Sequence, residues 1–151
     1  LEGVEATVED DPVRALKGAQ IVIAATDASE PVFPGDAVEP GTHVNGVGSY
    51  TPDMQEVGAE LDSRAKVVVD SMEGALAEAG DLIIPIRDGL FSADDIHAEL
   101  GELVRGTKQG REDPSEVTFF KSVGNAAQDV AVAGRIFRRA RSMDLGTVVE
   151  L

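Results

Sequence analysis

The stretch that decides the fold is residues 41–56, which read GTHVNGVGSYTPDMQE. The apolar residues at 44–47 predict a short strand that ends at Gly48, after which Thr51 and Pro52 begin a helical turn. In open α/β sheets, ligands bind outside the carboxyl ends of the strands. A glycine at such an end lets the backbone come close to a ligand, because it has no Cβ atom. The pattern therefore indicates a candidate site, although an ordinary joint between a strand and a helix has the same form.

Helices and strands alternate on both sides of this stretch. Continuous apolar runs predict strands buried on both faces at residues 21–25, 66–70 and 117–121. The alternation indicates an α/β fold, in which helices cover both faces of a parallel sheet. Helices are predicted from Asp11 to Gly18, in a short turn at 34–38 and over residues 53–65, with or without a break at Gly58. Further helices are predicted over residues 72–79, 92–105 and 125–143, with extended segments at 82–85 and 146–151.

The composition is that of one acidic domain. The chain has 151 residues, and its 28 acidic and 13 basic residues give a net charge of −15. Such a charge repels phosphate backbones and anionic membranes, so we expect neither nucleic acid nor a membrane as a partner. No apolar run approaches the ~18 residues that span a bilayer, and no signal-peptide pattern is present. We therefore expect a cytoplasmic protein, either an ordinary acidic one or one adapted to high salt.

Metal and disulfide chemistry finds no support in the sequence. There are no cysteines, which excludes disulfides and thiolate metal sites. The two histidines, His43 in a strand and His97 on an exposed helix, lack the spacing of metal ligands. We expect no metal site and no catalytic role for either histidine.

Candidate site residues follow three of the predicted strands. Thr26 follows the first strand, Gly48 and Ser49 the second, and Ser122 the last, and parallel strands bring all three ends to one edge. Ser122 and the amides after it are expected at a helix amino end, which offers free N–H donors. No G-x-G-x-x-G motif occurs. The sequence therefore predicts half of a dinucleotide site, without the part that binds the pyrophosphate.

Several motifs agree on one family. They read ALKGAQIV at 15–22, PGTHVN at 40–45, VGSYTPDM at 47–54, EAGDL at 78–82 and FKSVG at 120–124. In this order and at this spacing, they resemble the C-terminal half of the ornithine cyclodeaminase/mu-crystallin family. The resemblance implies a Rossmann-type domain that binds NAD or NADP, within a homodimer of two-domain subunits.

The resemblance also implies roles for individual residues. Thr26 would lie beside the adenosine part of the cofactor, and Ser122 with Val123 would contact the cofactor near its nicotinamide. Tyr50 and Glu78 would lie near the substrate. The residues expected beside the nicotinamide are Val47, Gly48, Ser49 and Tyr50.

The resemblance covers only part of such a protein. Residues 1–142 would form the distal part of the cofactor domain, without the first βαβ unit and its glycine motif. Residues 143–151 would return toward a dimerisation domain. We therefore expect a fragment of a longer chain, with an exposed sheet edge and no complete active site of its own.

The implied chemistry is hydride transfer at the Cα atom of a small amino acid or cyclic imine. True ornithine cyclodeaminases carry an aspartate at the position that Tyr50 occupies. A phenol cannot replace a carboxylate as a base near neutral pH. The sequence therefore favours a ketimine reductase or amino-acid dehydrogenase over a cyclodeaminase. The alternative is a non-catalytic, crystallin-like or ligand-binding member of the family.

Overall fold

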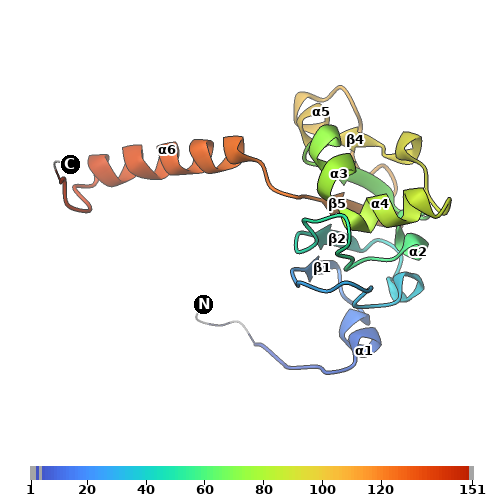
Figure 1. Cartoon of the computed structure of the whole chain (residues 1–151). Coiled ribbons are helices and arrows are strands. Elements are labelled where there is room, and N and C mark those ends of the chain that lie inside the picture. The colour runs from blue at the N-terminus through green and yellow to red at the C-terminus, as the bar shows by residue number, and fades with distance from the viewer. Residues whose placement is uncertain (1–2, 4, 150–151) are drawn as a thin grey trace.

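A five-stranded parallel sheet organises the part of the chain that the structure describes, which is residue 3 and residues 5–149 of a computed structural model (Figure 1). The strand order is β1-β2-β5-β3-β4, and every pairing is parallel. The predicted α/β fold is confirmed. The strands are β1 (Ile21–Ala24), β2 (His43–Gly46), β3 (Lys66–Val69), β4 (Ala98–Glu99) and β5 (Thr118–Lys121).

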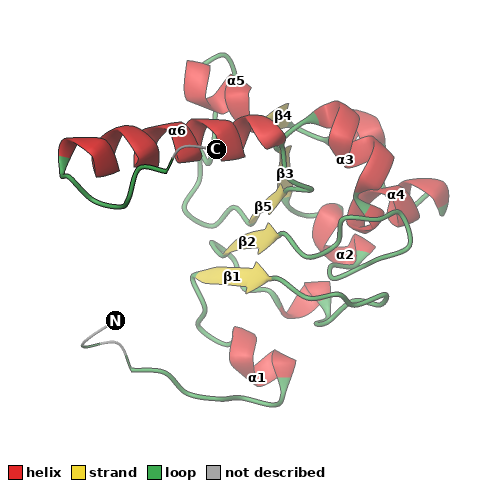
Figure 2. Ribbon diagram, turned by 60° about the vertical axis from the view of Figure 1, so that its left-hand side comes forward, coloured by secondary structure: helices red, strands yellow, loops and turns green. Residues whose placement is uncertain are grey.

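Helices connect the strands. Figure 2 shows α2, α3 and α4 on one side of the sheet and α5 on the other, beside β4. The α-helices are α1 (Pro12–Leu16), α2 (Ala59–Asp62), α3 (Met72–Glu78), α4 (Gly80–Arg87), α5 (Leu100–Arg105) and α6 (Ala126–Ser142), and two 3₁₀ turns are η1 (Gly35–Ala37) and η2 (Ala93–Asp95).

The core lies between the sheet and the layer of α2, α3 and α4. Val44, Phe119 and Val67 occupy one row across β2, β5 and β3, and all three are fully buried. Leu61 of α2 and Leu82 of α4 belong to the same buried cluster. Alternate residues of a strand point to opposite faces, so this row fixes which face of the sheet is inside.

The opposite face is open at β1, the outer strand of the sheet. Ile21 is 65% exposed and Ile23 is 67% exposed. The prediction that residues 21–25 form a strand buried on both faces is therefore wrong, because no described helix covers this face of β1. By contrast, Val67 and Val68 point to opposite faces of β3, and both are buried.

The helix predicted over residues 53–65 is wrong except for α2. The backbone N–H groups of Glu56 and Val57 donate to the Asp81 carboxylate, at 2.6 and 3.0 Å, instead of to carbonyls one helical turn earlier. Residues 51–58 consequently form turns, and α2 begins only after Gly58.

The extended segment predicted at residues 82–85 is also wrong, because it lies inside α4. Proline costs about 3 kcal/mol in a helix interior, so Pro85 is an unusual residue within α4. Pro85 and Leu82 are both buried in the helix, and that burial offsets the cost.

The single helix predicted over residues 92–105 is wrong as well. The chain there forms η2, then β4, then α5. The His97 N–H donates to the Val67 carbonyl at 2.9 Å, and Ala98 pairs with Val68, so β3 draws these residues into the sheet. His97 is therefore not on an exposed helix, and its Nε2 lies 2.8 Å from the Gln109 carbonyl oxygen.

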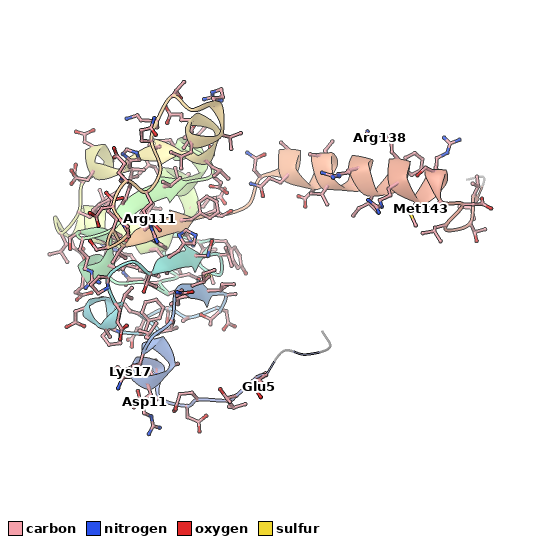
Figure 3. All side chains as sticks on the ribbon, turned by 180° about the vertical axis from the view of Figure 1, so that it is seen from behind. Glu5, Asp11, Lys17, Arg111, Arg138 and Met143 are labelled. Atoms are coloured by element: carbon pink, nitrogen blue, oxygen red, sulfur yellow. The ribbon has the colours of Figure 1, made fainter. Side chains whose placement is uncertain are left out.

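The predicted helix over 125–143 is confirmed as α6, which Asn125 caps by accepting from the Ala127 N–H. It extends away from the sheet (Figure 1), and Figure 3 shows Arg138 and Met143 far from the body. Ile136 and Phe137 are more than half exposed on it. Of the tail predicted at 146–151, the part up to residue 149 contains no strand, and residues 150 and 151 lie outside the described residues.

Candidate functional site

The carboxyl ends of four parallel strands meet at one edge of the sheet, and hydrogen bonds join the residues that follow them. The Val47 N–H donates to the Ala24 carbonyl at 3.0 Å, and the Ser122 N–H donates to the Gly46 carbonyl at 3.1 Å. The Asp70 N–H donates to the Lys121 carbonyl at 3.2 Å. The loops after β1, β2, β3 and β5 therefore start side by side, as the sequence predicted for three of them.

A buried carboxylate, that of Glu56, links two of these loops. Its Oε2 accepts the backbone N–H groups of Gly48 at 2.7 Å and Ser49 at 3.0 Å, just after β2. Its Oε1 accepts the backbone N–H of Thr26, just after β1. Glu56 is fully buried. These three N–H donors replace the hydrogen bonds to water that a carboxylate loses on burial.

Position 48 must be glycine because the loops after β1 and β2 lie so close together there. A Cβ atom on Gly48 would collide with the backbone nitrogen and oxygen of Thr26 and with the Glu56 carboxylate. The neighbouring Ser49 is fully buried, and its hydroxyl donates to the Met54 carbonyl at 2.8 Å. The backbone after β2 is thus held from both sides.

Beneath this loop lies a buried ion pair. Asp81 Oδ2 and Lys121 Nζ are 2.9 Å apart, and both side chains are fully buried. The contact does not have hydrogen-bond geometry, so charge attraction is what joins the two groups. Asp81 Oδ1 accepts the N–H groups of Glu56 and Val57. The ion pair therefore connects β5 and α4 to the segment that carries the Glu56 carboxylate.

A third buried carboxyl group, that of Asp62, forms no hydrogen bond to this network. Only 1% of Asp62 is exposed, and neither carboxyl oxygen has a hydrogen-bond partner. Burial, with repulsion from Asp81 and Glu60, raises the pKa of Asp62 to about 8. The group is therefore neutral below that pH.

On the other side of the edge, Asp70 fixes the loop after β5. Its Oδ2 accepts from the Ser122 hydroxyl at 2.6 Å and from the N–H groups of Val123 and Gly124 at 3.2 and 3.1 Å. The expectation that Ser122 and the amides after it lie at a helix amino end is wrong, because α6 begins only at Ala126, with Asn125 as its cap. The amides expected to be free for a ligand already have a carboxylate partner.

The structure brings most of the expected site residues to this one edge. Thr26 is exposed, Val47 is 43% exposed and Tyr50 is 58% exposed. Ser122 and Val123 are half-buried beside them. Their expected contacts with a cofactor or substrate stay predictions.

Glu78 is exposed at the end of α3. The backbone two residues later does reach the edge, because a Cβ atom on Gly80 would collide with the carbonyls of Met54 and Thr51. The expected role of Glu78 near a substrate stays a prediction.

The edge fits one end of a dinucleotide better than the other. It offers an exposed valine and an exposed tyrosine, which suit a flat aromatic ring such as nicotinamide. The N–H groups of Gly48, Ser49, Val123 and Gly124 all donate to protein carboxylates. A pyrophosphate needs free N–H donors, so the described residues fit the nicotinamide end and not the pyrophosphate.

Other kinds of site find less support. A cavity of about 950 Å³ lies at the opposite, amino ends of the strands, where it is lined by Ile21, His43, Lys66, Thr118 and Arg111 among others. In the described part of the chain, no cluster of three His, Cys, Asp or Glu side chains is placed to hold a metal ion. No described helix has the length and apolarity needed to cross a membrane.

The prediction from sequence missed Glu56, Asp81 and Lys121. One signal for Lys121 was present, because strand alternation puts it on the same face as the buried Phe119. A lysine on an inward face needs an acidic partner. Nothing local distinguishes Glu56 from the other acidic residues, since its partners lie up to 30 positions away in the chain.

The fold and the edge together define a class. A parallel sheet with clustered loops at its carboxyl edge is the arrangement of a Rossmann-type α/β domain, here without the glycine-rich turn. The family model for the ornithine cyclodeaminase/mu-crystallin family matches residues 1–144. The chain belongs to this family.

Individual relatives agree with the family. The chain is 46% identical over 149 residues to a Delta(1)-pyrroline-2-carboxylate reductase of Bacillus cereus, an alignment that covers 98% of this chain and 46% of the relative. A solved structure of the Thermococcus litoralis Delta(1)-pyrroline-2-carboxylate reductase with NADH and L-proline matches with a TM-score of 0.85 and 44% identity, over 91% of this chain and 42% of that one. An archaeal alanine dehydrogenase dimer with bound NAD matches with a TM-score of 0.87 and 35% identity, over 99% of this chain and 46% of that one. The chain thus spans about half the length of the relatives it matches.

Proposed function

We propose that this chain is the distal half of the cofactor domain of an NAD(P)-dependent oxidoreductase. The enzyme would act on a cyclic imine or a small amino acid, with Delta(1)-pyrroline-2-carboxylate as the first substrate to test. The observation that carries the proposal is the carboxyl edge, where Val47, Tyr50 and Ser122 come together from adjacent strands. Similarity to two pyrroline-2-carboxylate reductases supports the choice of substrate.

The residues of this chain would bind and orient the cofactor rather than move protons. A nicotinamide cofactor supplies the hydride when it is bound. The backbone from Val47 to Tyr50 would carry the ring, and Ser122 with Val123 would lie beside it. Thr26 would lie beside the adenosine part. The upstream half would supply the pyrophosphate turn, which is the part that these residues lack.

Tyr50 supports reduction of an imine over cyclodeamination. It lies exposed at the edge, where a substrate would meet it, and Glu78 is the second residue that we propose near the substrate. A phenol offers a hydrogen bond without the negative charge of the aspartate that cyclodeaminases use. Simple hydride transfer to the imine carbon requires no carboxylate base at this position.

The whole protein would be a dimer in the cytoplasm. A related alanine dehydrogenase is a dimer, and the exposed apolar side chains of α6 support a covering partner. We propose that residues 1–142 belong to the cofactor domain and that residues 143–151 return toward a dimerisation domain.

The test is calorimetric titration of NADH and NADPH into this chain and into a chain that is extended upstream, followed by turnover of Delta(1)-pyrroline-2-carboxylate. We expect only the longer chain to bind and to oxidise the cofactor. Release of ammonia and proline from ornithine without net NADH formation would instead identify a cyclodeaminase. Cofactor binding without turnover of imines or amino acids would support the crystallin-like alternative, and no binding by either chain would overturn the proposal.

A further inference from the structure

We infer that Glu56 is a positioning residue, whose carboxylate holds the loops after β1 and β2 at the separation that a bound nicotinamide cofactor requires. The inference rests on the proposed function for the role of these loops. The hydrogen bonds themselves are features of the structure.

The first support is how completely the carboxylate is used. Both oxygens of Glu56 accept backbone N–H groups, from Thr26 on one side and from Gly48 and Ser49 on the other. These donors lie 30, 8 and 7 positions away in the chain, in two different loops. A single side chain therefore fixes the distance between the two loops.

The second support is that Glu56 is itself held in place. Its backbone N–H donates to Asp81 at 2.6 Å, and Asp81 is paired with Lys121 at the end of β5. Its carbonyl accepts the Val32 N–H at 2.9 Å. Glu56 is thus connected to β5 and α4, so the two loops that its carboxylate binds are fixed relative to the sheet as well as to each other.

The third support is that Glu56 does not reach the surface. It is fully buried, while Val47 and Tyr50 above it are exposed. It therefore acts through the backbone that it binds and does not touch substrate or cofactor. A shift of about 1 Å in that backbone would be enough to slow hydride transfer roughly 100-fold.

The test is the Glu56→Gln variant in the whole-length protein, with Glu73→Gln as the matched control, because Glu73 is exposed on α3. The glutamine oxygen can still accept from Gly48 and Ser49, but its NH₂ group then faces the Thr26 N–H, and that donor loses its acceptor. We expect faster amide hydrogen exchange in the segment that contains Thr26, measured without cofactor. We also expect the NADH dissociation constant to rise roughly tenfold and kcat to fall roughly 10- to 100-fold.

The kinetic isotope effect separates positioning from mere stability. With NADH deuterated at the transferred hydrogen, the isotope effect on kcat should increase in Glu56→Gln, because hydride transfer becomes rate-limiting. If the melting temperature falls while exchange at Thr26, NADH affinity and the isotope effect all match the wild type, the inference is wrong. A wild type that neither binds nor oxidises NADH or NADPH would defeat the proposed function instead, and hydrogen exchange would still test whether Glu56 holds the two loops. Should Glu56→Gln not fold, Glu56→Asp takes its place, since it keeps the charge but is too short to reach both loops.

Discussion

Replacing Lys121 by methionine should destabilise the protein strongly, because it leaves the Asp81 charge buried without its ion-pair partner. Both side chains are fully buried, and their charged atoms are 2.9 Å apart. Removing one member of such a pair typically costs about 3–5 kcal/mol. The two N–H groups that still bind Asp81 Oδ1 soften the loss, so we expect about 3 kcal/mol.

The double variant Lys121→Met with Asp81→Asn is the informative comparison. Asparagine keeps an oxygen for the N–H groups of Glu56 and Val57 and removes the unpaired charge. Replacing a whole buried pair is often nearly neutral, so the double variant should recover most of the lost stability. Equilibrium urea unfolding, followed by circular dichroism, gives the three free energies of unfolding. A Lys121→Met variant within about 1 kcal/mol of the wild type, or a double variant less stable than the single one, would refute this reasoning.

Three further predictions concern single groups and solvent. Asp62 keeps its proton in the folded state up to about pH 8 but loses it near pH 4 when unfolded, so the free energy of unfolding should fall between these values as pH rises. Urea unfolding at several pH values should show that the free energy of unfolding of Asp62→Asn does not fall in this way. The variant should be more stable than the wild type at pH 8 and differ little from it at pH 4. Equal changes of the free energy of unfolding with pH in the two proteins would contradict the prediction. Gly48→Ala should cost roughly 1–3 kcal/mol, because the new methyl group meets the backbone of Thr26, and a melting temperature equal to the wild type would count against that geometry. If the net charge of −15 reflects adaptation to salt, the melting temperature should rise from low to molar KCl, whereas a flat response would indicate an ordinary acidic protein.

Four of the five strands were predictable from their own residues, and β4 was not, because it lies in a segment that was predicted as a helix. The apolar runs that form β1, β3 and β5 are readable without knowledge of the rest of the chain. Two of the failures share one cause, which is a contact with residues far away in the sequence. The Val67 carbonyl accepts the His97 N–H, which places that segment in the sheet. The Asp81 carboxylate accepts the Glu56 N–H, which is then not available for a helical hydrogen bond. Helical periodicity around these residues carries no trace of such partners.

The candidate site was predictable in outline but not in its support. Gly48 and the strand ends marked the edge, because a glycine after an apolar run is a local signal. The role of Glu56 was not visible, since it depends on an arrangement that exists only after Thr26 and Gly48 have come together. Nor did the sequence reveal that the Asp70 carboxylate would accept hydrogen bonds from the backbone N–H groups of Val123 and Gly124.

The outer position of β1 suggests a use for this chain in protein engineering. Its outer edge and its exposed Ile21 and Ile23 form a surface onto which another strand can add through backbone hydrogen bonds. Supplied as a separate polypeptide, an upstream half from a relative should associate with this edge and reconstitute a cofactor domain without a covalent link. Under the proposed function, the pair would behave as a split cofactor domain, whose binding of NADH or NADPH reports whether two molecules fused to its halves have met.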